Sequence, residues 1–364
     1  MSAPRVALVV DSDAWGGAEV YARHLLRRAA SQGWQPSLVC SEPVAGGLVD
    51  AVPQTSVRVV PLLRHREHAG PALAALRALR PDAVLVNLVD PGSNAAVLAA
   101  ACSVAPTVGT LHLPGDLDRG PGRDALTRLY GRLAGVLTPS GEGRDQVVAG
   151  LRVPADRVRV VPNGVDIPDQ VRRPDVGRPP RIGVVARLTR QKGVDVLLRA
   201  VRTLHGGGVP LRVAVAGAGR DAAALAGEAA DLPVTFSGFV DDVPAFLRGL
   251  DVFCLPSRQE ALPLALLEAM AVGLPCVVSD VGEIRAAVDG AAVLVPPEDD
   301  RALADALRHL LVDGADRARL GRLARARAVA SLDADLMARR TFASLRELTL
   351  PREPGGSPRA PSPV

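Results

Sequence analysis

Glu260 and Glu268 lie eight positions apart in a segment that is otherwise almost entirely apolar, QEALPLALLEAMAVGLP at residues 259–275. Leucines fall on every side of the helix expected over residues 262–270, so this helix should be buried on all its faces. A buried carboxylate is costly unless a cation or a ligand meets it, and its two oxygens can accept hydrogen bonds from the vicinal hydroxyls of a sugar. The spacing predicts a ligand with a sugar at Glu260 and a ribose at Glu268. The structural alternative is a core ion pair between Glu268 and an arginine.

The segment RLTRQKG, residues 187–193, carries cations where a strand is expected to end and a helix to begin. Lys192 is the single lysine among the 43 lysine and arginine residues of the chain, which indicates a position where a compact ammonium is preferred to a planar guanidinium. Two cations beside a helix N-terminus form a good site for a diphosphate. We therefore expect Arg187 and Lys192 to bind a diphosphate that lies between the sugar and the ribose. A solvated basic loop is the alternative.

Two further features follow expected strands of the first half. Gly16 and Gly17, in DSDAWGGAE, would let the backbone approach a ligand, although a plain structural turn explains a double glycine equally well. The third glycine of the dinucleotide-binding fingerprint is missing, which argues against a nicotinamide dehydrogenase. His112 stands at another strand end, where an imidazole could hydrogen-bond a sugar hydroxyl, but a lone histidine is more often structural. Asp11 and Asp13 are expected to end a strand rather than to bind a metal.

The elements that position these residues alternate between short apolar runs and helical stretches, a pattern typical of parallel α/β folds. A proline-rich segment without periodicity, residues 162–180, interrupts it. The expected fold class is two doubly wound, Rossmann-like α/β domains that face a central cleft, with ligands beyond the carboxyl ends of the strands. Strands are expected at residues 5–10, 37–40, 57–61, 83–87, 107–111, 135–138 and 157–161, and at 181–187, 211–217, 234–239, 251–257, 275–280 and 291–296.

Composition limits the class of protein. A length of 364 residues suits two domains, and an aromatic content of 2% argues against the stacking platforms that bind single-stranded nucleic acid. The net charge of +4 is compatible with an anionic ligand. Neither a signal peptide nor a membrane span is expected, so we expect a cytoplasmic protein, and the preference for arginine suggests a bacterial genome rich in G and C. Buried free thiols are expected at the four scattered cysteines, Cys40, Cys102, Cys254 and Cys276.

Taken together, these segments resemble the retaining GT-B glycosyltransferases of family 4, which use nucleotide-sugar donors. The resemblance extends to about residue 345. The glutamate pair followed by Gly-Leu-Pro is its most specific part, and the double glycine is its least specific part. The matching segments are WGGAE (15–19), PNGVD (162–166), ARLTRQKG (186–193), FSGFVDDVPAFL (236–247), DVFCLPSRQEALPLALLEAMAVGLPCVVSD (251–280) and AAVLVPPEDDRALADAL (291–307).

The resemblance implies a role for each matching residue. Arg187 and Lys192 would hold the donor diphosphate, Glu260 would contact the donor sugar, and Glu268 would contact the ribose. His112 would reach the transferred sugar and complete the catalytic set of Arg187, Lys192 and Glu260, with no metal or other cofactor. The rest of the donor site would be Gly16, Gly17, Ala261, Leu262, and Phe239 and Val240 beside the nucleobase.

The resemblance also implies a domain organisation, with two local departures. Ala261 stands where the family usually has glycine, and VGEIRAA at 281–287 differs from the usual run, which makes Arg285 a candidate partner for Glu268. The expected parts are an acceptor-binding domain (1–165), a linker (166–180), a donor-binding domain (181–332), a helix that packs back on the first domain (333–350) and a disordered tail (351–364).

The expected activity is transfer of a sugar, with its anomeric configuration retained, from a nucleotide-sugar to an acceptor hydroxyl on a glycolipid, a cell-surface glycan or a natural product. Two alternatives keep the ligand: a sugar-nucleotide epimerase or phosphorylase on the same fold, and a catalytically silent subunit that only binds the sugar nucleotide. No nucleic acid partner is expected. A weak peripheral membrane contact is a further hypothesis, but the helical angles of Arg119, Arg123, Arg128 and Arg132 scatter and favour a solvated surface.

Overall fold

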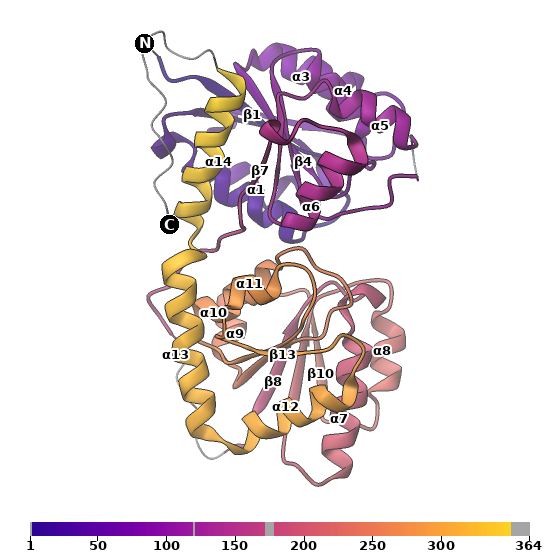
Figure 1. Cartoon of the computed structure of the whole chain (residues 1–364), viewed down its shortest axis with the longest axis vertical. Coiled ribbons are helices and arrows are strands. Elements are labelled where there is room, and N and C mark those ends of the chain that lie inside the picture. The colour runs from indigo at the N-terminus through magenta and orange to yellow at the C-terminus, as the bar shows by residue number, and fades with distance from the viewer. Residues whose placement is uncertain (1, 119–120, 172–177, 351–364) are drawn as a thin grey trace.

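Each half of the chain forms its own parallel sheet (Figure 1). The computed structural model describes residues 2–118, 121–171 and 178–350. The first sheet has the strand order β3-β2-β1-β4-β5-β6-β7, and the second has the order β10-β9-β8-β11-β12-β13. The strands are β1 Arg5–Val10, β2 Gln35–Ser41, β3 Val57–Val60, β4 Ala83–Leu88, β5 Thr107–Leu111, β6 Gly135–Thr138, β7 Val158–Val160, β8 Arg181–Val185, β9 Arg212–Ala216, β10 Val234–Gly238, β11 Val252–Leu255, β12 Cys276–Ser279 and β13 Val293–Val295.

Helices connect the strands and lie against the sheets (Figure 1). Those of the first half are α1 Gly17–Arg28, α2 Glu42–Ala45, α3 Gly70–Leu79, α4 Ala95–Cys102, α5 Arg123–Tyr130 and α6 Gly141–Asp145. Those of the second half are α7 Val194–Gly206, α8 Ala222–Glu228, α9 Val243–Arg248, α10 Leu264–Ala271, α11 Ile284–Val288, α12 Asp300–Val312, α13 Gly314–Ser331 and α14 Ala334–Thr349.

The central strands are apolar along their whole length because helices cover both faces of each sheet. Every residue of β4, β5, β11 and β12 is buried, as expected for parallel sheets of this type. The strands expected from the sequence are confirmed, with bounds that differ by one or two residues. The most important of these differences concern residues 186–187 and 256–257. These residues lie after the ends of β8 and β11 and begin loops of the candidate site. The strand pattern therefore places the carboxyl-end loops correctly.

The last helix, α14, lies against the first domain although it follows the second in the chain (Figure 1). The Tyr21 hydroxyl on α1 and the Thr341 hydroxyl on α14 are 3.3 Å apart, and the rings of Trp34 and Phe342 pack at 6.3 Å between centroids. The chain passes between the domains beside a short parallel bridge that pairs Val165 with Asp333. The N-terminal domain therefore includes a C-terminal helix in its packing.

The cysteines are free, as expected, but their burial is not uniform. Cys40, Cys254 and Cys276 are buried within strands, whereas Cys102, at the end of α4, is only half-buried, so the expectation of a buried thiol was wrong there. Within the described residues no helix is long and apolar enough to cross a lipid bilayer. The expected linker falls partly, and the expected tail wholly, outside the described residues.

Candidate active site between the two domains

The helix α10 carries Glu268 because its sequence allows a buried helix with sharp ends. Pro263 precedes the first helical residue and has no backbone N–H to lose. After the helix, Gly273 adopts a left-handed conformation with φ +79°, which reverses the chain and lets the Leu274 amide donate to the Ala269 carbonyl at 3.0 Å. The leucines between these ends are buried. Glu268 is thus the one acid held on a helix whose other surfaces are packed.

Glu268 has no protein partner within the described part of the chain. Its carboxylate forms neither a hydrogen bond nor an ion pair there, and Arg285, the candidate partner, pairs with Asp280 instead. Burial raises the pKa of the Glu268 carboxyl to about 7, a charge on Asp166 adds to the rise, and the positive charge of Arg23 on α1 opposes it. The core ion pair considered as the structural alternative is therefore not formed, and this acid is available to a ligand.

Glu260, in contrast, already has partners within the protein. The Lys192 ammonium lies 2.8 Å from both carboxylate oxygens, and the Ser257 hydroxyl donates to Oε1 at 2.7 Å. The Glu260 side chain is 3% exposed and that of Lys192 is 20% exposed. The sequence placed both residues at one site, but it did not predict that they bind each other directly.

Two glycines bring the Lys192 and Glu260 loops together. Gly193, with φ +65°, follows Lys192, and a Cβ added there would lie 1.9 Å from the carbonyl oxygen of Pro256. Gly282, with φ +56°, lies on the other side, and a Cβ there would meet the carbonyl oxygen of Glu260 at 2.1 Å. Neither position can take a side chain without moving backbone. The acid is therefore held between two close backbone approaches that only glycine permits.

The same loop is also anchored by charge. The guanidinium of Arg258 donates to both carboxylate oxygens of Asp195 on α7, each at 2.7 Å, and it pairs with Glu298. These contacts lower the pKa of Asp195 to about 2 because a hydrogen-bonded cation favours the charged carboxylate. Ala261 and Leu262, expected in the donor pocket, are buried at 2% and 5% exposure. The loop therefore has little freedom to move away from Lys192.

Arg187 reaches from the second domain to the double glycine of the first. A methyl group added to Gly16 would lie 3.1 Å from Nη2 of Arg187, and one added to Gly17 would lie 3.8 Å from Leu264. Arg187 forms no hydrogen bond or ion pair within the described residues, and it is exposed. The structure therefore brings together Arg187 and the Gly16–Gly17 turn, as expected for two parts of one site, and leaves the guanidinium free for an anion.

Glu19 is a charged residue of this region that the sequence reasoning missed. It is 2% exposed, and its Oε2 atom would lie 3.4 Å from a methyl group on Gly16. Burial raises the pKa of its carboxyl, and Ser12, the backbone at Glu19 and Gly16, and the charge of Arg187 oppose that rise. Its position three residues after the glycine that caps α1 is where a capping acid is found, and that spacing could have revealed it.

His112 follows β5 and is held on three sides. Its amide donates to the Leu88 carbonyl at 2.9 Å, its Nε2 atom lies 2.5 Å from Oδ1 of Asn87, and its ring packs edge-on against Tyr21 at 4.9 Å. Burial lowers the pKa of the imidazole to about 4, so the ring is neutral at pH 7. Asn87 was also missed by the sequence reasoning, although a single amide near the end of the apolar run AVLVNL indicates a special position.

Phe239 and Val240 lie at the carboxyl end of β10, the outer strand of the second sheet. Gly238 turns the chain there with φ +66°, and the Phe239 side chain is 57% exposed. An exposed aromatic ring at a strand end is suited to stacking on a flat group. The structure leaves this ring accessible, at the edge of the sheet rather than beside Glu268.

Two polar contacts join the domains close to these residues, and a third, within the second domain, supports one of them. The Asn163 side-chain amide donates to the Leu262 carbonyl at 2.7 Å, which links PNGVD to the Glu260 loop. The Gly141 amide donates to Oε1 of Glu283 at 2.6 Å. The Glu283 amide in turn donates to the Ala261 carbonyl at 3.0 Å. The segment that departed from the family pattern thus supplies a direct contact between the two domains.

Comparison with known proteins agrees with this architecture. The family model described as "Glycosyltransferase Family 4" matches residues 15–168, and the model described as "Glycosyl transferases group 1" matches residues 179–313. The chain belongs to the group 1, family 4 glycosyltransferases. Its fold, two parallel-stranded Rossmann-like domains, is the GT-B fold of this family.

Individual relatives are similar over part of their length. The chain is 37% identical over 173 residues to the putative colanic acid biosynthesis glycosyltransferase WcaL of Escherichia coli, a match that covers 42% of each chain. It is 36% identical over 163 residues to the phosphatidyl-myo-inositol mannosyltransferase of Mycobacterium leprae, over 42% of this chain and 43% of the relative. The chain thus matches less than half the length of these curated relatives. The crystal structure of Anabaena HepE with UDP and glucose superposes with a TM-score of 0.78 at 18% identity, over 94% of this chain and 99% of HepE.

Proposed function

We propose that this protein is a metal-independent, retaining glycosyltransferase that moves a sugar from a nucleotide-sugar to an acceptor hydroxyl. The observation that carries the proposal is the contrast between Glu260, which is bound to Lys192, and Glu268, which has no partner within the described residues although burial raises its pKa. An acid held at that cost is explained by a ligand that donates hydrogen bonds to it.

The donor would extend along the residues that the fold brings together. Its diphosphate would bind Arg187 and Lys192, its sugar hydroxyls would meet Glu260, and its ribose hydroxyls would donate to Glu268. These two hydroxyls favour the charged carboxylate, so we expect donor binding to lower the pKa of Glu268. The remaining donor contacts would come from Gly16, Gly17, Ala261 and Leu262, with Phe239 and Val240 at the nucleobase.

Catalysis would be electrostatic. The bond between the anomeric carbon of the sugar and the phosphate oxygen breaks, and a bond from the same carbon to the acceptor oxygen forms on the same face. The positive charges of Arg187 and Lys192 stabilise the departing diphosphate, so the proposal needs no metal. The acceptor proton passes to a departing phosphate oxygen, and no protein base is required. His112, neutral at pH 7 because burial lowers its pKa, would orient the transferred sugar through a hydrogen bond.

The donor and the acceptor are to be found by experiment, and the relatives suggest where to begin. HepE has been crystallised with UDP-glucose, and a relative from Mycobacterium tuberculosis, 35% identical over 175 residues, is named as a GDP-mannose-dependent mannosyltransferase. We propose to measure the melting temperature with UDP, GDP, ADP and dTDP and with their common sugar derivatives. A ligand at 100 times its dissociation constant stabilises the folded protein by about 2.7 kcal/mol, which is a shift that is easily seen.

The activity test follows from that screen. The wild-type protein, supplied with the stabilising nucleotide-sugar and a panel of lipid, glycan and small-molecule acceptors, is expected to give a glycosylated product whose anomeric configuration matches the donor by NMR. A screen in which no nucleotide raises the melting temperature contradicts the proposed function. Binding without turnover on any acceptor supports the silent subunit instead, and a change in the sugar without transfer supports the epimerase.

A further inference from the structure

We propose that Asn87 is a positioning residue that holds His112 with its proton on Nε2 and so presents Nδ1 as a hydrogen-bond acceptor to a substrate hydroxyl. The first part of this inference concerns the free protein alone. The second part, the contact with a substrate hydroxyl, rests on the proposed function.

The orientation of the Asn87 amide decides which histidine nitrogen carries the proton. Its nitrogen donates to the Ala18 carbonyl at 3.2 Å, so its oxygen is the atom that lies 2.5 Å from Nε2 of His112. An amide oxygen can only accept a hydrogen bond, so Nε2 must be the donor. In a neutral imidazole the other nitrogen, Nδ1, then has no proton and accepts.

Asn87 is suited to this task because it is itself immobile. It is 5% exposed and is the last residue but one of β4, where it is paired in register with Thr110 of β5. The amide therefore spans from the sheet to the first turn of α1, directly after Gly17. One side chain links the Gly16–Gly17 turn with His112, two parts of the proposed donor site that lie far apart in the sequence.

The surroundings keep the imidazole neutral and in place. The groups that face it come from α1, β4 and β5: the titratable Tyr21, whose hydroxyl has a pKa of about 12 because it is buried, and the uncharged Asn87. Burial lowers the pKa of His112, and within the described residues no hydrogen bond or ion pair joins its ring to a charged side chain. A carboxylate placed at residue 87 would put a negative charge at hydrogen-bond distance from Nε2.

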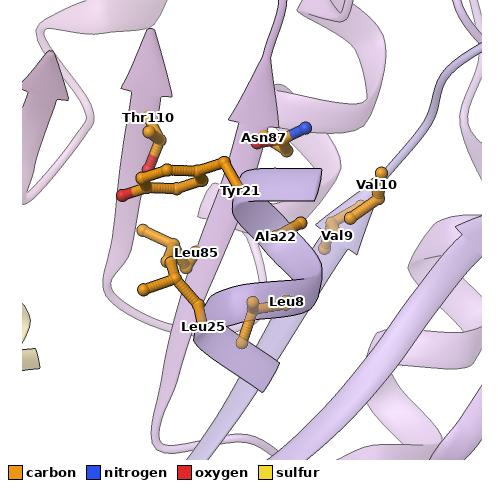
Figure 2. A pocket seen from close by; sticks show the side chains of 9 residues that line it. All are labelled: Leu8, Val9, Val10, Tyr21, Ala22, Leu25, Leu85, Asn87 and Thr110. Carbon is orange, nitrogen blue, oxygen red and sulfur yellow. The ribbon is translucent and has the colours of Figure 1, made fainter. Parts of the chain in front are cut away.

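The packing beside Asn87 leaves almost no free space. A cavity of about 10 Å³ lies between α1 and strands β1, β4 and β5, where Asn87, Tyr21 and Thr110 lie above a floor that includes Leu8, Leu25 and Leu85 (Figure 2). Such a volume holds about one water molecule and not an imidazole. Asn87 and Tyr21, which both contact His112, therefore have little room to move.

The first experiment tests the tautomer in the free protein. The chain has six histidines, so labelling with ¹⁵N-histidine gives a spectrum in which the His112 resonances can be assigned from His112→Gln. We expect the shifts of the Nε2–H tautomer for His112 at pH 7 in wild type, and loss of that single tautomer in Asn87→Leu. A protonated imidazole at pH 7, or the Nδ1–H tautomer, overturns the proposal whatever the protein's activity.

The second experiment tests the use of Nδ1 in turnover with the donor found by the screen. Asn87→Asp keeps an acceptor for Nε2 but adds a negative charge, which raises the pKa of His112. We expect a new ionisation in the pH profile of kcat, with activity lost below it as Nδ1 becomes protonated. Asn87→Leu should lower kcat about tenfold at every pH and leave the acceptor KM unchanged.

Thr110→Val is the matched control, because Thr110 lines the same cavity and pairs with Asn87 between the strands, whereas Asn87 supplies the hydrogen bond to His112. We expect this variant to keep the wild-type tautomer, kcat and pH profile. An unchanged kcat and pH profile in both Asn87 variants, together with the Nε2–H tautomer in wild type, overturns the role of Nδ1 in turnover. A wild-type chain that transfers no sugar contradicts the proposed function and leaves the tautomer result standing.

Discussion

Glu260 and Glu268 belong to one short segment, yet the protein treats them in opposite ways. Glu260 is 3% exposed and accepts from Lys192 and Ser257, whereas Glu268 keeps some exposure and has no partner within the described residues. Burial raises the pKa of Glu268 to about 7, because no hydrogen bond or ion pair within the described residues compensates the lost hydration of its charge and the charge of Arg23 opposes the rise only in part. The comparison teaches that environment, not residue type, decides which carboxylate has its charge compensated by the protein and which is left to a ligand.

Glu260 and Glu268 would also contribute to a donor site in different ways. The Lys192–Glu260 pair is preorganised, so its ammonium has a defined position before a diphosphate arrives. Glu268 is held ready at a cost in stability, which a ribose would remove. Together, these features would give a donor site that is rigid where the diphosphate binds. Where the ribose binds, the site would offer a carboxylate that is ready to accept hydrogen bonds.

The largest effect is expected from removal of the cation that distinguishes the two acids. Lys192→Ala takes away one of the two charges proposed to stabilise the departing diphosphate, so kcat should fall at least about 100-fold. It also leaves a buried carboxylate without a counter-charge, which should lower the free energy of unfolding by about 2–4 kcal/mol. Turnover assays and urea unfolding measure the two effects.

Two variants control that experiment. Arg190→Ala removes an exposed cation of the same loop and should change the free energy of unfolding by less than about 0.5 kcal/mol. Lys192→Met combined with Glu260→Gln removes both charges, so it should recover stability and remain inactive. Near wild-type turnover in Lys192→Ala would show that the Lys192–Glu260 pair stabilises the fold and takes no part in catalysis.

The next effect in size concerns Glu268. Glu268→Gln removes the charge that would accept hydrogen bonds from the ribose, so the affinity for the nucleoside diphosphate should fall about tenfold or more. Calorimetric titration of wild type and variant measures this. The exposed Glu228→Gln of the same domain should leave the affinity unchanged, and an unchanged affinity in Glu268→Gln would mean that the ribose does not meet this acid.

The pH dependence of stability sharpens the comparison further. The pKa of Glu268 is raised from its usual value of 4.5 to about 7, so the native state binds more protons than the unfolded state between these values. The contribution of Glu268 to stability is therefore greatest below pH 4.5 and is lost as the pH rises towards 7, with a slope of at most about 1.4 kcal/mol per pH unit. The difference in unfolding free energy between wild type and Glu268→Gln, measured from pH 4.5 to 8, should follow this course. A flat difference would show that this carboxyl already has a partner.

The smallest effect is expected at a third acid of the same domain. Glu283 accepts from the Gly141 amide across the domain boundary at 2.6 Å. Glu283→Ala should speed hydrogen exchange of the Gly141 amide and destabilise the protein by about 1 kcal/mol, the usual value of one hydrogen bond. Glu283→Gln keeps an acceptor oxygen and should behave almost as wild type. Equal exchange rates in all three proteins would mean that the contact does not hold the domains.

Much of the fold was predictable from the sequence because its determinants are local. The apolar runs from Arg5–Val10 to Val293–Val295 appeared at the expected places, since a buried parallel strand is recognised by its own composition. Arg187, Lys192, Glu260 and Glu268 could also be selected as candidate site residues from the sequence, because glycines, prolines and isolated charges mark the ends of the strands. These positions could be named, but their mutual contacts could not.

The amino-acid sequence by itself determined two parallel α/β domains, the strand ends that carry the candidate site, and the residue types available there. Only the tertiary structure decided that Lys192 pairs with Glu260 and that Arg187 lies beside Gly16. It also decided that Asn87 joins Ala18 to His112 and that Glu268 forms no hydrogen bond or ion pair among the described residues. The physical reason is that helix and strand patterns reflect neighbours along the chain, whereas hydrogen bonds, charges and burial at a site depend on residues brought together from distant segments, whose distances no local pattern specifies.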